Sequence, residues 1–166
     1  MRVGQAKELF RALTQQYFGG ANVVFANQSR TAKQKEPLVV LTPGNVHRPQ
    51  APNYTFVDGE VVGHYLSRFS ITVDLFTNGS PAVDEVSGKA VAYEDNAVDD
   101  MLSFADFLNS EHAVQWSHQN DVSILIDGDV LNLTGVVNDT SYEFRSRLTV
   151  QFYFTQKAVG ASTALL

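Results

Sequence analysis

Apolar and polar side chains alternate along two segments, 68–77 and 145–154, which read RFSITVDLFT and RSRLTVQFYF. A period of two predicts β-strands with one buried face and one polar face. Because both segments begin with arginine and end near aromatic residues, we predict that they are neighbouring strands of one sheet. The side chains predicted on the buried face are Phe69, Ile71, Val73, Leu75, Leu148, Val150, Phe152 and Phe154.

Three other segments repeat their apolar residues with a helical period. The first is 3–17, the second is 97–109 with Asn96 as its N-cap, and the third is the short segment 111–119 with Ser110 as its N-cap. The side chains predicted to face the core from the second and third helices are Val98, Met101, Leu102, Ala105, Leu108, Ala113, Val114 and Trp116.

Shorter β-branched and aromatic runs predict additional strands at 21–27 and 37–42. Asp-Gly pairs at 58–59 and 127–128 each predict a β-hairpin, because this dipeptide favours the positive φ angles of a tight turn. The segment 78–96 predicts a loop.

Two segments outside these elements predict an arm and a C-terminal tail. The segment 43–53 holds three of the five prolines and predicts an extended excursion. Together with the hairpin that follows, it predicts an arm over 43–65, which we expect to reach a neighbouring molecule. The small, apolar residues 157–166 predict a weakly structured C-terminal tail.

The order of helix, strands, two helices and strands predicts an α+β fold, in which a mainly antiparallel sheet packs against two or three helices and carries a protruding β-hairpin arm. A length of 166 residues fits one domain, which we place at 1–156. Apolar residues make up 44% of the chain and supply the core.

The composition argues against several classes of protein. The chain has no cysteine, so disulfides, thiolate nucleophiles and Cys-ligated zinc are excluded. No apolar run approaches the roughly 20 residues of a membrane helix, and the N-terminal residues lack the apolar stretch of a signal peptide, so we expect synthesis in the cytoplasm. The net charge is −6, and the densest basic cluster, Arg30, Lys33 and Lys35, lies in a predicted loop, which argues against direct nucleic-acid binding.

Catalytic chemistry finds little support in the sequence. The histidines are His47, His64, His112 and His118, and the last two are six residues apart, a poor spacing for metal ligands on one helix face. The carboxylates of 94–100 are explained by the start of a helix, where the dipole favours negative charge. Neither a Gly-x-Ser-x-Gly elbow nor a Gly-x-Gly-x-x-Gly phosphate loop is present. We therefore predict no catalytic residue, no metal site and no cofactor.

The strand patterns and their order resemble one known family. The segments 68–74, 122–133 and 142–154 carry the likeness, which covers most of 3–156. The layout resembles the phage neck and tail terminator proteins. The resemblance implies a sheet packed against helices, six copies assembled in a ring, and a non-enzymatic role in capping the tail tube and joining it to the head.

Six residues are candidates for contact between subunits. Three arginines fall at the predicted starts of the two twin strands, and arginine is enriched at interfaces because its planar guanidinium pairs with a carboxylate through two hydrogen bonds. A carboxylate of the same chain or of a neighbouring chain would be the partner. Two aromatic residues lie on the predicted polar face, where exposed apolar side chains are expected to be covered by a helix, an arm or another subunit. The candidates are Arg68, Arg145, Arg147, Phe76, Tyr153 and Asp74.

The sequence thus predicts a structural virion protein of the head–tail junction. The expected partners are further copies of the chain, the tail tube protein, a neck or head-completion protein and the tail sheath, while DNA passes through the ring without specific binding. A head-completion or adaptor protein of the same neck is an alternative. A small hydrolase or ligand-binding domain is an alternative from a different class.

Overall fold

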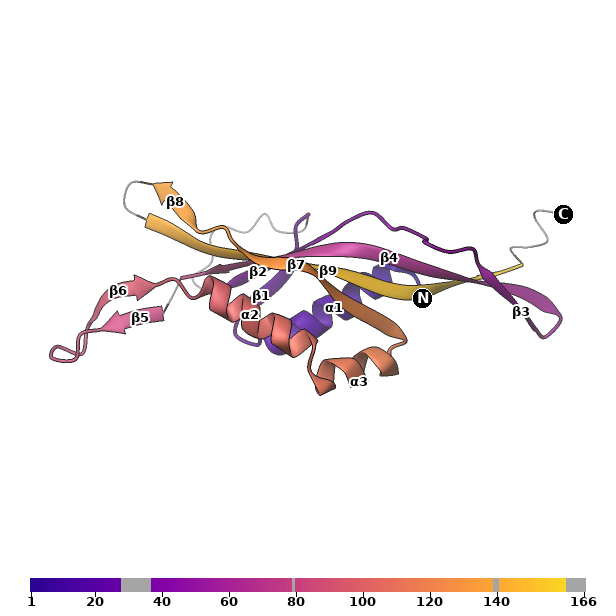
Figure 1. Ribbon diagram of the computed structural model, residues 1–166, viewed down its shortest axis with the longest axis horizontal. Coiled ribbons are helices and arrows are strands. Elements are labelled where there is room, and N and C mark those ends of the chain that lie inside the picture. Colours follow the sequence, from indigo (N-terminus) through magenta and orange to yellow (C-terminus); the bar gives the residue numbers. More distant parts are fainter. Residues whose placement is uncertain (28–36, 79, 139–140, 161–166) are drawn as a thin grey trace.

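The computed structural model describes residues 1–27, 37–78, 80–138 and 141–160, and it has the predicted α+β architecture (Figure 1). The basic cluster at 30–35 and the final residues 161–166 lie outside this described part. The elements in chain order are α1 (Val3–Tyr17), β1 (Asn22–Phe25), β2 (Leu38–Pro43), β3 (Asn53–Val57), β4 (Glu60–Thr77), β5 (Ser80–Val83), β6 (Ala90–Glu94), α2 (Ala97–Leu108), α3 (Glu111–Gln119), β7 (Val122–Asn132), β8 (Gly135–Asn138) and β9 (Ser141–Val159).

The main sheet has the strand order β1-β2-β4-β9-β7, with β3 paired to β4 and β8 paired to β9. Strands β1 and β2 run parallel, and the other described pairs are antiparallel. The twin segments are neighbours as predicted, since β4 pairs with β9 from Val62↔Val159 to Thr77↔Phe144. This long ladder forms the centre of the sheet.

The core lies between this sheet and the three helices, which cover one face (Figure 1). All eight side chains predicted on the buried face of the twin strands are buried. Helix α1 contributes Phe10, whose ring meets that of Phe152 edge-on, with the centroids 5.9 Å apart. The alternation read from the sequence therefore identifies the correct face of both strands.

The predicted faces of α2 and α3 need correction. Helix α2 buries Ala97, Met101, Phe104 and Leu108, whereas Leu102, predicted inside, is 47% exposed. The four buried residues are spaced four, three and four positions apart along the helix, so they form one stripe, and Leu102 lies outside it. Helix α3 touches the core mainly through Ala113, so Val114 is 58% exposed instead of buried. A helix of nine residues that lies at the edge of the sheet buries only one narrow side.

The hairpin predicted at 127–128 is wrong. Strand β7 continues through Gly128 to Asn132, and the register against β9 shifts between Asp127 and Leu131. Gly128 has a φ of 83°, so the Asp-Gly pair forms a bulge within the strand instead of a turn. The 19-residue β9 explains the difference, because it offers backbone partners to β7 on both sides of the bulge, at 122–127 and at 131–132.

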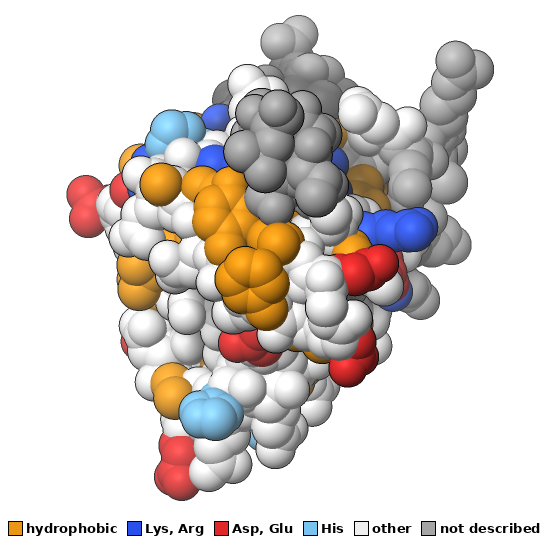
Figure 2. Space-filling model, turned by 90° about the vertical axis from the view of Figure 1, so that its right-hand side faces the viewer, with side chains coloured by type: hydrophobic (Ala, Val, Ile, Leu, Met, Phe, Trp, Pro, Cys, Tyr) orange, Lys and Arg blue, Asp and Glu red, His pale blue; other side chains and the backbone are white. Residues whose placement is uncertain are grey.

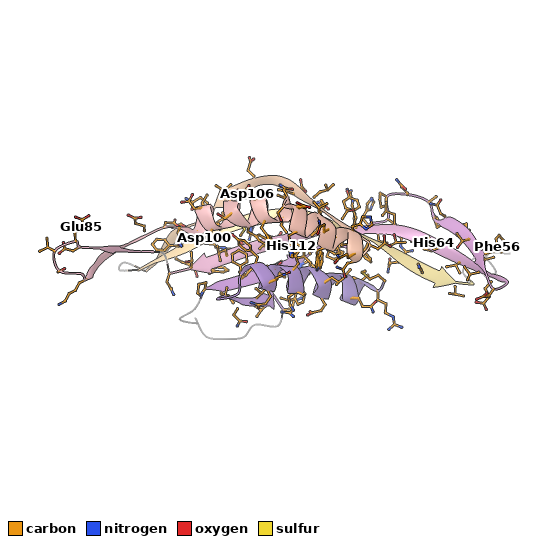
Figure 3. All side chains as sticks on the ribbon, turned by 90° about the horizontal axis from the view of Figure 1, so that it is seen from below. Phe56, His64, Glu85, Asp100, Asp106 and His112 are labelled. Carbon is orange, nitrogen blue, oxygen red and sulfur yellow. The ribbon has the colours of Figure 1, made fainter. Side chains whose placement is uncertain are left out.

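The loop predicted at 78–96 also needs correction, because β5 and β6 form a second hairpin there. The side chain of Asp84 organises its turn by accepting hydrogen bonds from the Val86 amide at 3.1 Å and the Ser87 hydroxyl at 2.7 Å. These bonds lower the pKa of Asp84. This hairpin protrudes at the end of the molecule opposite β3 (Figure 3).

The arm predicted over 43–65 is present as the β3–β4 hairpin, and Asp58 and Gly59 both have positive φ angles, as its tight turn requires. The preceding excursion is not free of the sheet, because His47 and Arg68 exchange two backbone hydrogen bonds of 2.7 and 2.8 Å. Strand β9 runs through Val159, so the first residues of the predicted C-terminal tail are part of the arm.

The corrected face of α2 leads to a stability prediction. We expect Phe104→Ala to lower the free energy of unfolding by about 3–5 kcal/mol, because it opens a cavity at a fully buried position. Leu102→Ala on the same helix is the control, and we expect it to change the stability by less than about 1 kcal/mol. Urea denaturation measures both variants, and equal losses would contradict the assignment of the buried face.

Candidate functional site

The face of the sheet opposite the helices carries all six candidate residues. Backbone register brings them together in pairs across β4 and β9: Asp74↔Arg147, Phe76↔Arg145 and Arg68↔Tyr153. No helix of the described part of the chain lies over this face (Figure 1). We call the six side chains the open-face residues.

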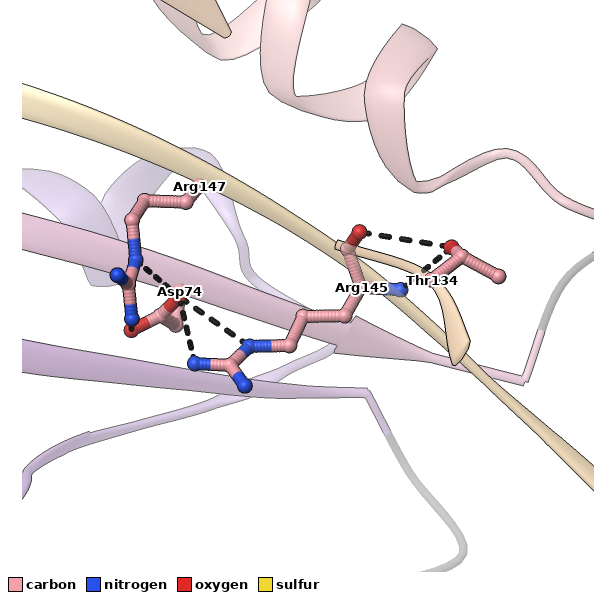
Figure 4. A network of polar contacts seen from close by, with 4 residues as sticks. All are labelled: Asp74, Thr134, Arg145 and Arg147. Atoms are coloured by element: carbon pink, nitrogen blue, oxygen red, sulfur yellow. Dashed lines mark hydrogen bonds and ion pairs between the residues drawn. The ribbon is translucent and has the colours of Figure 1, made fainter. Parts of the chain in front are cut away.

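Asp74 is the centre of an ion-pair cluster in which two arginines bind one carboxylate (Figure 4). Arg147 donates from Nε to Oδ1 at 2.9 Å and from Nη2 to Oδ2 at 3.1 Å. Arg145 donates from Nη2 and Nε to Oδ1 at 3.1 and 3.3 Å. The side chain of Asp74 is 6% exposed, whereas those of Arg145 and Arg147 are 30% and 37% exposed.

The cluster has a net positive charge, since two guanidinium groups share one carboxylate. The hydrogen bonds that Arg147 donates to Asp74, together with the Coulomb attraction between the two groups, raise the pKa of Arg147. The guanidinium of Arg145 also lies over the ring of Phe76, 4.8 Å from its centroid. These contacts shield the carboxylate and leave part of both arginines facing solvent.

The backbone of Arg145 ties the cluster to the start of α2. Its amide donates to the hydroxyl of Thr134 at 3.0 Å (Figure 4). That hydroxyl donates to Asp95 Oδ2 at 2.6 Å. Asp95 in turn accepts from the amide of Ala97 at 3.0 Å. The position of Arg145 is therefore fixed from the helical layer as well as from the sheet.

Arg68 lies apart from the other two arginines. Because β4 begins at Glu60, Arg68 is in the middle of the strand and not at its start, which corrects the sequence prediction. It lies six residues from Asp74, roughly 20 Å along a strand that rises about 3.3 Å per residue. Its guanidinium donates to the hydroxyl of Tyr153 at 3.3 Å. The antiparallel pairing separates the arginines, since the beginnings of β4 and β9 lie at opposite ends of the ladder.

The ion pairs answer one question that the sequence left open. Arg145 and Arg147 bind a carboxylate of the same chain, which is one of the two alternatives. Contact of the open-face residues with another subunit stays a prediction.

The other candidates for chemistry have local roles. His64 shares a hydrogen bond of 2.7 Å with the hydroxyl of Thr55 on the β3–β4 hairpin. Asn96 occupies the N-cap position of α2, but its side chain donates to Asp100 at 2.9 Å and Asp95 caps the helix instead. Burial, and to a lesser extent the charge of Asp99, raise the pKa of Asp100.

The described residues contain no group of three or more metal-ligating side chains in a suitable arrangement. None of the helices in the described part is long and apolar enough to cross a membrane.

Sequence reasoning missed one apolar surface, at the end of the β3–β4 hairpin. Hydrophobic side chains gather at this end of the molecule (Figure 2), and Phe56 is 80% exposed at the tip (Figure 3). Aromatic residues in a hairpin that extends beyond the helices cannot reach the core. The Asp-Gly turn two residues after Phe56 is the sequence signal that could have indicated this exposure.

The ion-pair cluster leads to a second stability prediction. We expect Arg145→Met and Arg147→Met to cost about 1 kcal/mol each in the free energy of unfolding, because the remaining arginine still neutralises Asp74. The double variant is expected to lose about 2 kcal/mol more than the sum, since it leaves a buried carboxylate without a counter-ion. Replacing Asp74 by Asn in the double variant should recover most of this excess. Additive losses in urea denaturation would contradict the shared pairing.

Comparison with known proteins gives the chain its identity. A search of curated proteins finds no match. The family model described as phage neck terminator protein matches residues 7–164, which is almost the whole chain and spans both twin strands, the helices and the arm. The resemblance seen in the strand patterns is thereby confirmed, and the chain belongs to the phage neck terminator protein family.

Proposed function

We propose that copies of this chain assemble into a ring at the head–tail junction, where the ring stops growth of the tail tube and joins the tube to the neck. Membership of the phage neck terminator family makes the chain a structural protein of the bacteriophage neck, and thus of the virion. The observation that carries the finer proposal is the sheet face that no helix of the described residues covers, on which Arg145, Arg147, Phe76 and Tyr153 remain partly exposed.

The proposed mechanism is geometric and involves no catalysis. A ring with closed rotational symmetry uses one heterologous interface, in which two different surfaces of the protein meet. The likeness to neck and tail terminators supports six copies. Permanent interfaces of this kind usually bury on the order of 2,000 Å² or more. Such a ring presents one side to the tube and the other to the neck.

The open-face residues are proposed to contact another subunit. Arg145 and Arg147 each use Nε and Nη2 to bind Asp74, and the rest of each guanidinium points away from that carboxylate (Figure 4). Their remaining N–H groups suit a second carboxylate. Tyr153 and Phe76 supply apolar contact area beside these charges. This mixture of arginine and aromatic residues is typical of interface centres.

The proposed partners are further copies of the chain, the tail tube protein, a neck or head-completion protein and the tail sheath. DNA passes through the ring without specific binding, which the net charge of −6 supports because an acidic protein repels the phosphate backbone.

The ring proposal is tested by assembling particles without this chain. We expect tails of uncontrolled length that do not join to heads, and we expect the added protein to restore joined particles with the chain located at the junction by a label in electron micrographs. Tails of normal length that join to heads in its absence would overturn the proposal.

A variant tests the open-face contact separately. We expect Arg68→Ala to raise at least about tenfold the concentration at which copies of the protein assemble on purified tails. Its unfolding curve should stay close to that of the wild type, because among the described residues the side chain donates one hydrogen bond, of 3.3 Å, to Tyr153. Lys89→Ala, which removes a positive charge from the exposed β5–β6 turn, is the control. Cosedimentation with tails measures both, and equal binding of the Arg68→Ala variant would contradict this contact.

A further inference from the structure

Charge is unevenly distributed along the chain. Between Lys89 and Arg145 the sequence contains no lysine or arginine, so all twelve positive side chains lie outside this segment. Most of the acidic residues lie inside it: Glu94, Asp95, Asp99, Asp100, Asp106, Glu111, Asp121, Asp127, Asp129, Asp139 and Glu143. A chain with a modest net charge thus has one strongly acidic segment.

The fold places the central part of this acidic segment, residues 97–132, on one flank of the molecule. Helices α2 and α3 and strand β7 all come from it, and β7 is the strand at that edge of the sheet. Asp99, Asp106 and Glu111 are exposed on the two helices. Leu102 and Val114 are the exposed apolar residues among them, at 47% and 58%. We call the surface formed by these five side chains, two apolar and three acidic, the α2–α3 flank.

The opposite flank is formed by α1 beside β1, at the other edge of the sheet. Seen from the helical side of the sheet, α1 and α2 lie beside each other, with α1 toward one long edge of the helical layer and α2 toward the other (Figure 3). Helix α1 carries the positive residues Lys7 and Arg11, and Arg2 is its N-cap, against one acidic residue, Glu8, which is paired with Arg11. We call this surface the α1 flank.

The α1 flank also has a shallow hollow that suits apolar side chains. It has a volume of about 720 Å³ and is lined by Met1, Gly4, Gln5, Glu8, Leu9 and Ala12. A Cβ atom added at Gly4 would meet no atom within 4 Å, so the surface is open there. Small residues on the outer side of a helix allow another helix to approach closely. The hollow beside Gly4 and Ala12 therefore has room for the side chains of Leu102 and Val114.

From this complementarity we infer that the α2–α3 flank of one copy docks against the α1 flank of a second copy. The inference rests on the proposed ring, since a heterologous interface needs two different surfaces on opposite sides of one molecule. Leu102 and Val114 enter the hollow, while Asp99, Asp106 and Glu111 face the positive residues of α1. We assign the partner as a second copy because one chain carries both complementary surfaces: the acidic flank with exposed apolar side chains and the basic flank with the hollow.

Two charge-reversed proteins test this contact. Variant one, Asp106→Arg with Glu111→Arg, has two positive flanks, and variant two, Lys7→Glu with Arg11→Glu, has two negative flanks. Either variant alone brings like charges together at every contact, so we expect the concentration needed for assembly on purified tails to rise at least about tenfold. All four positions lie on the surface, and circular dichroism and thermal unfolding check that both variants fold.

Mixing the two variants in equal amounts gives the decisive result. Every contact in an alternating ring is then complementary, and we expect native mass spectrometry of rings released from tails to show even-numbered rings with equal numbers of both variants. Glu85→Arg, at the β5–β6 turn, controls for a change in charge alone and should assemble like the wild type.

The outcomes separate the two proposals. If each variant alone assembles as well as the wild type, or if the mixture does not recover assembly while the wild type forms rings, the flank contact is wrong and the ring stands. If the wild type forms no ring on tails, the proposed function fails.

Discussion

The pairing of β4 with β9 is the interaction on which the rest of the structure depends. The two strands are hydrogen-bonded from Val62↔Val159 to Thr77↔Phe144, so one ladder runs through the whole length of the domain. Its middle part carries the core, and one of its ends forms the base of the β3–β4 hairpin. Because side chains alternate between the faces of a strand, a shift by one residue would exchange the buried and polar sets. This register therefore fixes both the core and the open face.

The same register creates the Asp74 cluster. Arg147 lies directly opposite Asp74, and Arg145 lies opposite Phe76 on the same face. A carboxylate that is almost wholly shielded from solvent is costly unless it is paired, and here two arginines share the task. The residues that keep the fold consistent are thus also those that give the open face its charge. Stability and surface chemistry are coupled at this one position.

The helical layer gives the molecule two unlike sides. Helices α2 and α3 lie beside β7 and carry only acidic charges, whereas α1 lies beside β1 and carries mainly basic charges. A domain with unlike flanks is suited to repeat itself around an axis, because each copy offers a neighbour the surface that the next copy lacks. The β5–β6 and β3–β4 hairpins extend at opposite ends of the molecule, beyond the helices (Figure 1).

The sequence by itself determined the α+β class, the buried faces of the twin strands, the β3–β4 turn and the family, because each is written in a local pattern of apolar residues or turn residues. Only the tertiary structure decided that Gly128 is a bulge, that Leu102 is exposed and that Asp74 binds both arginines. Each of these depends on a partner far away in the chain. Strand β9 pairs with β7 on both sides of the bulge, the core against which α2 packs buries Phe104 instead of Leu102, and the β4–β9 register places the guanidinium groups beside Asp74. A local sequence pattern determines which conformations and environments a residue favours. Contacts with residues distant in the chain determine which of these the residue adopts in the fold.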